Sequence, residues 1–268
     1  MGFVPELIER ALPPDGAATE LLMRVAERHA AFVGGSFLCR DADGEIRNAF
    51  LLATPDGRIG GRHDKDLPTM WENCFYVGGD DDGVIETDAG FTAGAAVCWE
   101  FMRTQTVRRL RGKVDVVIGG SGWWSIPEHW GPSPLMRRLE AGNAATARAA
   151  IDAFAGFVGA PVVHAAHAGQ LECDSPALPL HYRGHFEGGA TIVDSDGTVV
   201  ARREYGAGEG VVLAEIQPKR RSPIAEPPDS FWLHSRGALP TLAWNLERLH
   251  GRRWYRRHNP GVRAATPA

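Results

Sequence analysis

The sequence is poor in cysteine and contains no long apolar segment. Four cysteines in 268 residues are typical of a reducing compartment, where thiols stay free, and a chain of this length buries enough surface to fold without disulfides. No apolar run approaches the roughly 20 residues that span a bilayer. The N-terminus has no basic segment followed by an apolar one, as a signal peptide has. These absences predict a cytoplasmic protein that binds no membrane.

The sequence also lacks an excess of basic charge and a phosphate-binding loop. Its formal net charge is −4, which argues against a nucleic-acid partner, because such proteins carry basic patches. No glycine-rich loop of the P-loop or dinucleotide-binding type is present. His164 and His167, with His181 and His185 after them, fall in expected strands and loops, where this spacing does not put two imidazoles on one face. The sequence therefore predicts no metal site.

What is present is an ordinary globular composition, 44% hydrophobic and 23% charged. Hydrophobic periods near 2 and near 3.6 residues distinguish strands from helices. The expected helices are 16–31, 103–111 and 143–157, and the expected strands are 31–38, 49–53, 91–98, 114–119, 162–166, 190–193, 199–203 and 211–216. Strands that alternate with helices, followed by a hairpin-rich second half, predict an α/β layered domain.

The character of the chain changes after Pro218. Residues 217–230 are rich in proline and charge. An amphipathic helix is then indicated by a set of spaced apolar residues: Leu239, Leu242, Ala243, Leu246 and Leu249. We expect one domain over 1–216 and a C-terminal tail over 217–268. The tail packs on the domain or on a partner subunit, or it is solvated and partly frayed.

Three residues, widely spaced in the chain, have side chains suited to thiol catalysis. Cys98 ends the expected strand 91–98; a cysteine in such a place is more often part of the core, but its thiolate can attack carbon when a base or a cation is near. Glu6, in a Pro-Glu pair at an expected strand end, is suited to act as that base. Lys65 supplies positive charge where an oxyanion develops.

In their order and spacing, Glu6, Lys65 and Cys98 resemble the Glu-Lys-Cys triad of the carbon–nitrogen hydrolase (nitrilase) superfamily. The resemblance runs from residue 3 to residue 216. Several short motifs around the triad are similar to those of the family and occur in its order: Phe-Val-Pro-Glu at 3–6, Gly-Gly-Ser at 34–36, Pro-Asp-Gly at 55–57, Leu-Pro-Thr at 67–69, the segment 78–83, and the strand and Asp-Gly turn at 188–197. Each motif is weak alone, and their combination is specific.

The resemblance implies an α/β fold, a four-layer αββα sandwich, in a homodimer or higher homo-oligomer. It also implies that Cys98 is the nucleophile, that Glu6 transfers the proton, and that Lys65 and the backbone N–H of Trp99 hold the oxyanion. Glu72 matches a second glutamate that orients the lysine or the substrate. The family implies no cofactor, metal or organic. A small-molecule nitrile or amide is the implied partner.

The substrate stays open among nitriles, amides and N-carbamoyl compounds. The run Cys98-Trp99-Glu100 looks more like the nitrilase branch than the amidases. Trp123 and Trp124 stand where the family usually has small residues, and they either form an aromatic wall for an apolar part of the substrate or pack within a loop. Two other functions also stay open: a scaffold that binds without catalysis, and transfer of the acyl group to an amine.

The resemblance implies one further feature of the chain. The family places a strand, a helix and most of a second strand before its Pro-Glu, whereas this pair stands at residues 5 and 6. We therefore expect that this sequence lacks the first β–α unit of the domain, and that roughly 30 to 40 further residues, the size of such a unit and a strand, are encoded upstream.

Overall fold

The computed structural model describes residues 4–128, 131, 133–174, 181–234 and 238–259. The chain divides into two compact units. The first unit comprises Met1–Asp81, Asp174–Leu180 and Arg236–Ala268, and the second comprises Asp82–Cys173 and His181–Ser235. Of the helices in the described ranges, none has the length and apolar character needed to cross a membrane.

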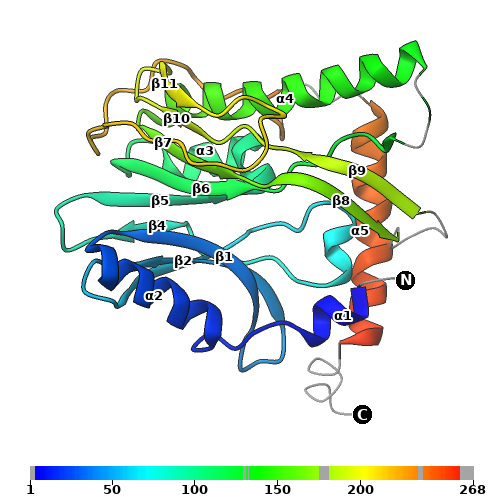
Figure 1. The fold of residues 1–268 in the computed structure, drawn as a ribbon, viewed down its shortest axis with the longest axis horizontal. Coiled ribbons are helices and arrows are strands. Elements are labelled where there is room, and N and C mark those ends of the chain that lie inside the picture. The colour runs from blue at the N-terminus through cyan, green and yellow to red at the C-terminus, as the bar shows by residue number, and fades with distance from the viewer. Residues whose placement is uncertain (1–3, 129–130, 132, 175–180, 235–237, 260–268) are drawn as a thin grey trace. The chain divides into compact units, whose positions relative to one another are not determined.

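The first unit is built on a three-stranded antiparallel sheet in the order β1-β2-β3. Its elements are α1 (Val4–Glu9), α2 (Ala17–His29), β1 (Val33–Arg40), β2 (Ile46–Ala53), β3 (Ile59–Asp64), the 3-10 turn η1 (Met70–Cys74) and α5 (Ala238–His258). Helix α2 lies against β1 and β2 (Figure 1), where Leu22 covers Gly35. The strand β2 is buried along most of its length because it is central in the sheet.

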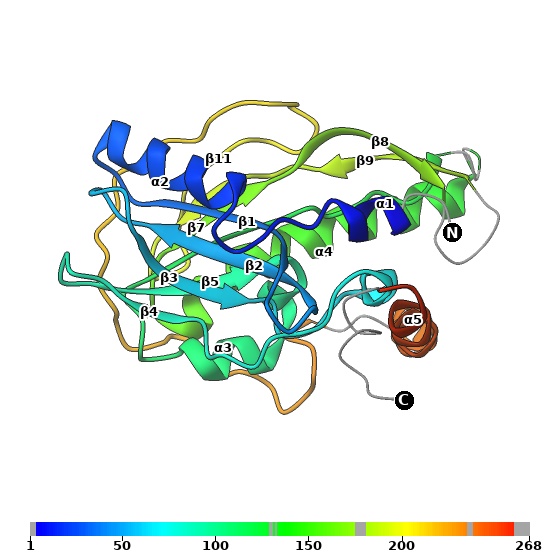
Figure 2. The same cartoon turned by 90° about the horizontal axis from the view of Figure 1, so that it is seen from below.

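A cluster of apolar side chains joins α1, η1 and α5 in the first unit. Its buried members are Val4, Ile8, Ile46, Cys74, Phe75, Tyr76 and Tyr255. Figure 2 shows α5, in red, beside the cyan segment that contains η1. Gly251 permits this approach, because a Cβ there would lie 2.7 Å from the Cβ of Asn73. The amide of Ile46 donates to the phenolic oxygen of Tyr255 at 2.8 Å, which fixes α5 to β2.

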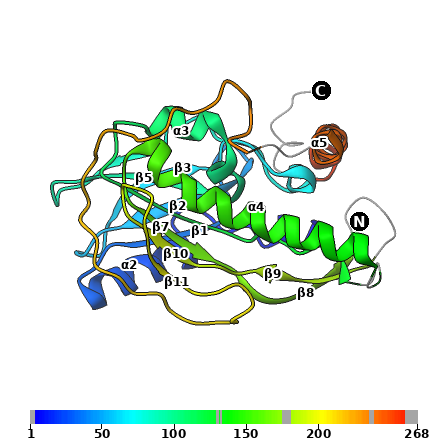
Figure 3. The ribbon, with the colours of Figure 1, turned by 90° about the horizontal axis from the view of Figure 1, so that it is seen from above.

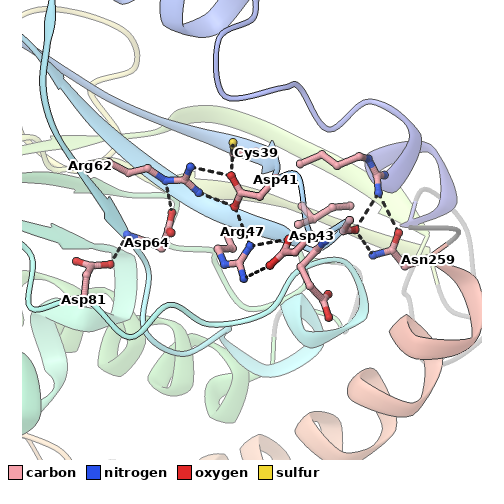
Figure 4. Close-up of polar contacts among 12 residues, drawn as sticks. Cys39, Asp41, Asp43, Arg47, Arg62, Asp64, Asp81 and Asn259 are labelled. Carbon is pink, nitrogen blue, oxygen red and sulfur yellow. Dashed lines mark hydrogen bonds and ion pairs between the residues drawn. The ribbon is translucent and has the colours of Figure 1, made fainter. Parts of the chain in front are cut away.

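One charged network runs across the sheet of the first unit (Figure 4). Asp41 accepts two hydrogen bonds from Arg62 at 2.8 Å and a third from Arg47 at 2.8 Å. Arg62 also donates to Asp64 at 2.8 Å, and Arg47 reaches Asp43 at 2.7 Å. These guanidinium contacts lower the pKa of Asp41. The network joins β3 to the loop after β1, immediately before the chain reaches Lys65.

The second unit is built on a six-stranded sheet in the order β11-β10-β7-β6-β5-β4. Its strands are β4 (Val84–Glu86), β5 (Thr92–Val97), β6 (Val116–Ser121), β7 (Val162–Ala166), β10 (Thr191–Val193) and β11 (Val199–Arg202), and β8 (Ala168–Asp174) pairs with β9 (His181–Glu187). The remaining elements are the 3-10 turn η2 (Cys98–Met102) and the helices α3 (Thr104–Leu110) and α4 (Pro134–Val158). The three central strands, β5, β6 and β7, are parallel. Their carboxyl ends therefore meet at one edge of the sheet.

Helices α3 and α4 share one hydrophobic core with the sheet of the second unit (Figure 3). Val107 and Leu110 come from α3, and Phe154 and Val158 come from α4. β5 and β6 approach each other closely at Gly119, where a Cβ would overlap the carbonyl oxygen of Ala96. Burial of this apolar layer is the main stabilising term for the unit.

Most expected elements are confirmed, and the expected strand 211–216 is wrong. The expected strands 31–38, 49–53 and 91–98 correspond to β1, β2 and β5, and the expected strand 162–166 has the bounds of β7. The described segment 211–216 forms no strand; Val211 and Leu213, which should share a buried face, are 79% and 84% exposed. Alternation alone does not supply the neighbouring strand that a ladder needs. The structure also contains β4, β8, β9 and α1, which were not expected.

Candidate active site

Cys98 lies at a sharp corner where β5 ends and η2 begins. Its φ is +57°, in the left-handed region that a residue with a Cβ seldom adopts. Such strain is stored where the surrounding structure enforces it, and it is often found at functional sites. A nucleophile on a tight strand-to-helix turn projects from the end of its sheet. The corner therefore presents the thiol at the edge where the parallel strands end.

The buried carboxylate of Glu100 braces this corner. One of its oxygens accepts the backbone N–H of Val97 at 2.7 Å. The other accepts a hydrogen bond from Arg109 at 3.0 Å and lies 3.5 Å from Arg103. Glu100 is fully buried, so the two guanidinium groups offset the desolvation of its charge. Burial, and then the nearby Arg109, lower the pKa of Arg103 to about 9.

Aromatic rings surround Trp99, the residue that follows Cys98. The ring of Trp99 lies 5.7 Å from that of Trp123 and 5.5 Å from that of Trp232. Trp123 follows β6, the strand next to β5, and is 6% exposed. Trp124 is half-buried and contacts Tyr182, with ring centroids 6.0 Å apart. The structure thus brings Trp99 and Trp123 together near Cys98, with Trp124 one residue farther along.

Lys65 lies directly after β3 and is fully buried. Its ammonium donates to Glu72 at 2.6 Å and to the hydroxyl of Thr69 at 2.9 Å, and it lies 5.7 Å from the centre of the Tyr76 ring. The same oxygen of Glu72 accepts the phenolic O–H of Tyr76 at 2.5 Å. A buried ammonium needs such a charged partner. Glu72 therefore supplies the anionic partner of the buried Lys65.

The chain around Lys65 is held in an unusual conformation. Met70, at the start of η1, has a φ of +50°. The preceding Thr69 caps the turn, and its backbone N–H donates to Glu72 at 2.6 Å. Gly79 lies so close to the preceding loop that a Cβ there would lie 2.6 Å from the carbonyl oxygen of Asp64. The backbone thus closes tightly over the buried lysine.

The structure places Glu6 differently from the sequence expectation. Its Pro-Glu pair lies within the helix α1 (Val4–Glu9), so the expectation that it ends a strand is wrong. The side chain of Glu6 is 60% exposed and forms an ion pair with Arg10 at 2.7 Å. These two residues are four apart, a spacing that favours a helix over a strand. Phe3, the first residue of the quoted motif, lies outside the described residues.

The four cysteines differ in exposure. Cys39 and Cys74 are buried, whereas Cys98 and Cys173 are partly exposed. Burial is the largest cause that raises the pKa of Cys39 to about 11, and it likewise raises the pKa of Cys74 to about 11. Because the thiolate is the reactive form, Cys39 and Cys74 are poor nucleophiles near neutral pH.

Within the described part of the chain, one group of three side chains brings metal-ligating atoms within 4.8 Å of one another: Glu140, His185 and Glu187. Each already has a hydrogen-bonding partner: the N–H of Ile126 for Glu140, Glu128 for His185, and Asn143 for Glu187. These bonds account for the group without an ion, so it carries no metal assignment. Of the four histidines weighed from the sequence, only His185 belongs to it.

Sequence comparison adds the family. The sequence profile of the carbon–nitrogen hydrolases matches residues 1–226. The chain belongs to the carbon–nitrogen hydrolase family. No curated protein sequence matches this carbon–nitrogen hydrolase.

Solved structures similar to this carbon–nitrogen hydrolase show its fold. The crystal structure of a carbon–nitrogen hydrolase from Helicobacter pylori G27 has a TM-score of 0.59 at 20% identity, over 80% of this chain and 69% of that one. Nit3 of Saccharomyces cerevisiae, a member of branch 10 of the nitrilase superfamily, has a TM-score of 0.54 at 19% identity, over 81% of this chain and 71% of that one. A mutant amidase from Nesterenkonia sp. AN1, with acrylamide added to its active-site cysteine, has a TM-score of 0.58 at 17% identity, over 81% of this chain and 76% of that one. The α/β fold of the nitrilase type, expected from the resemblance, is confirmed.

Sequence reasoning missed the residues that support the site of this carbon–nitrogen hydrolase. Glu100 was quoted only as part of the Cys-Trp-Glu run, although its carboxylate braces the corner at Cys98. A glutamate followed by Arg103, just before the next helix, and by Arg109, on that helix, was the available signal. Asn143 was not singled out, yet it binds Trp123 and Glu187, which are 20 and 44 residues away. No local pattern marks contacts of that range.

Proposed function

We propose that this chain is a cysteine-dependent hydrolase of non-peptide carbon–nitrogen bonds in nitriles, amides or N-carbamoyl compounds. The observation that carries the proposal is the corner at Cys98. This residue is held at a φ of +57° at the end of a parallel strand, partly exposed and braced by Glu100. A thiol packed only for structure needs neither the strain nor the brace. Membership of the family supplies the class of reaction.

For an amide substrate, the thiolate of Cys98 attacks the carbonyl carbon, and the tetrahedral oxyanion is held by Lys65 and the backbone N–H of Trp99. Glu6 accepts the thiol proton and passes it to the nitrogen as the carbon–nitrogen bond breaks. Water then hydrolyses the thioester, releases the acid and restores the thiol. Glu72 keeps the ammonium of Lys65 in place through the 2.6 Å contact.

A substrate panel tests the proposal. Nitriles, ω-amides and N-carbamoyl compounds are offered, and the release of ammonia or amine is measured. Cys98→Ser is expected to abolish turnover of every substrate found, whereas Cys173→Ala, which removes the other partly exposed thiol, leaves it unchanged. In the wild type, iodoacetamide is expected to alkylate Cys98 before it alkylates Cys39 or Cys74. Full activity of Cys98→Ser contradicts the proposal.

The exposed position of Glu6 favours one alternative, a scaffold that binds a ligand without turnover. Glu6→Gln separates the two functions. A general base contributes about 100-fold or more to the rate, so that loss is expected if Glu6 transfers the proton. Arg10→Gln, which removes its ion-pair partner, is the matched control. Acyl transfer is distinguished by adding a primary amine at low concentration and analysing the products, because a transferase yields the substituted amide where a hydrolase still yields the acid.

The assembly and the location form the last part of the proposal. A homodimer in the cytoplasm is consistent with the family and with four free thiols. Light scattering of the purified chain measures the mass in solution. A mass of 29.1 kDa at micromolar concentration contradicts the dimer and leaves the chemistry at Cys98 untouched.

A further inference from the structure

The corner after β6 (Val116–Ser121) forms a wall beside the nucleophile. In the register of the parallel pair, Val97 lies opposite Gly120, so the chain leaves both strands at the same edge of the sheet. Cys98 follows the first strand, and Trp123 follows the second after Gly122. The rings of Trp99 and Trp123 are in contact at 5.7 Å. Trp123 is therefore linked to the corner that carries Cys98 through the ring of Trp99.

One amide side chain holds this wall. The Oδ1 of Asn143, on α4, accepts the indole N–H of Trp123 at 2.9 Å. Its Nδ2 donates to the carbonyl oxygen of Trp124 at 2.8 Å and to Glu187 at 2.7 Å. Both donor hydrogens and the acceptor are thus used, and the three bonds agree on the orientation of the amide. No hydrophobic side chain of this size makes the same set of contacts.

A second element, β9, completes the support. The buried Glu187 donates its backbone N–H to the carbonyl oxygen of Trp123 at 2.8 Å. Its carboxyl group faces Glu140 of α4 and His185 of its own strand, and Glu128 lies on the far side of His185. Burial and Glu140 raise the pKa of Glu187 to about 7. The carboxyl of Glu187 can therefore be protonated and still accept the hydrogen bond from Asn143.

The corner has little freedom to move. At Gly122 a Cβ would lie 2.7 Å from His167 and 3.3 Å from Phe186. The backbone of Trp124 pairs with that of Phe186, on β9, in an isolated antiparallel β-bridge. With the backbone confined in this way, the hydrogen bond from the indole to Asn143 holds the ring of Trp123 in its place against Trp99.

We propose that Asn143 is a positioning residue: it fixes the indole of Trp123 beside the nucleophile and thereby sets the size of the acyl group that the site accepts. The proposal rests on the proposed function of Cys98. An aromatic wall discriminates by shape, and one methylene in a fitted pocket changes kcat/KM by about tenfold or more. Loss of the amide releases the indole and weakens that discrimination.

The test compares Asn143→Leu, which keeps the volume and removes all three hydrogen bonds, with Thr146→Val on the same helix. Thr146 bonds only to the carbonyl oxygen of Gly142, within its own helix. The readout is the ratio of kcat/KM between the smallest and the largest substrates that the wild type accepts. We expect a change of about tenfold in N143L and less than about twofold in T146V. An unchanged ratio in folded N143L overturns the proposal.

A second variant and a second readout keep the test independent of turnover and of folding. Trp123→Phe replaces the indole by a smaller aromatic ring and loses the N–H that bonds to Asn143, so it should shift the same ratio in the same direction. Alkylation of Cys98 by iodoacetamide and by the bulkier N-phenylmaleimide, followed by mass spectrometry, gives a size ratio without any substrate. If the wild type turns over nothing, the proposed function fails, and this ratio still supports or overturns the role of Asn143. The near-UV circular dichroism of tryptophan should weaken in both variants.

Discussion

The carboxyl of Glu187 makes the stability of the protein depend on pH. Burial, and then Glu140, raise its pKa from 4.5 to about 7, while His185 acts in the opposite direction. In the unfolded chain the same group releases its proton near 4.5. Between these two values the folded state binds more protons than the unfolded state, so the free energy of unfolding falls as the pH rises. The contribution is fully present below about 4.5 and is lost as the pH passes about 7.

The perturbation is Glu187→Gln, which removes the titration and keeps an oxygen that can accept the hydrogen bond from Asn143. A change of this size in the pKa of one carboxyl corresponds to at most about 3 kcal/mol. The free energy of unfolding of E187Q, relative to that of the wild type, should therefore rise by about 2 to 3 kcal/mol between about pH 5 and about pH 8. The advantage of the variant grows at alkaline pH, because only the wild type then buries a charge beside Glu140.

The assay is urea unfolding at four pH values, followed by the fluorescence of the eight tryptophans. Glu172→Gln is the matched control, because Glu172 lies on the neighbouring strand β8 and its side chain is 62% exposed. Its curve should run parallel to that of the wild type. A difference between E187Q and the wild type that is flat with pH, or that grows toward acid pH, refutes the reasoning.

Two further predictions concern buried packing. Glu72→Gln leaves the fully buried Lys65 without its anionic partner, so the free energy of unfolding measured in urea should fall by about 3 kcal/mol. The control Glu86→Gln, at an exposed strand end, should change it by less than about 0.5 kcal/mol. Equal losses in the two variants contradict the role of the ion pair. Gly119→Ala places a Cβ on a carbonyl oxygen of the facing strand and should abolish folding as seen by thermal denaturation. Gly142→Ala, in an open helical position, should instead raise the free energy of unfolding by about 0.5 to 1 kcal/mol; stable folding of G119A would show that the two strands can separate.

The helices and strands that could be predicted from the sequence are those whose apolar pattern reflects burial in the core. The strand β7 (Val162–Ala166) was found because it is a short apolar run in the sheet core. The helix α4 was expected only from residue 143, yet it begins at Pro134, where Ser133 caps it by accepting the N–H of Met136 at 3.2 Å. In its first turns Leu135 and Leu139 are four residues apart but 62% and 46% exposed, so the pattern there does not reflect burial in the core. The polar strands β8 and β9 were missed for the same reason.

Some residues of the candidate site could likewise be predicted from the sequence, and others could not. Lys65 and Glu72 could be named from the resemblance, and the structure joins them at 2.6 Å. The spacing of Val97 and Glu100 could have predicted the brace, because a side chain three residues on can reach back to the backbone. Asn143 could not be found, because its partners lie on β9 and after β6. Hydrogen bonds across such distances depend on the fold.

The two supports of the candidate site act on different parts of it. Glu100 is bonded to Val97 and Arg109, so it fixes the backbone that carries the thiol. Asn143 is bonded to Trp123, Trp124 and Glu187, so it fixes the wall through residues other than Val97 and Arg109. Ring contact between Trp99 and Trp123 is the link between them. Substitutions at the wall can therefore change which acyl group is accepted while the geometry of the thiol is kept, and the rate of Cys98 alkylation by a small reagent should stay constant across them.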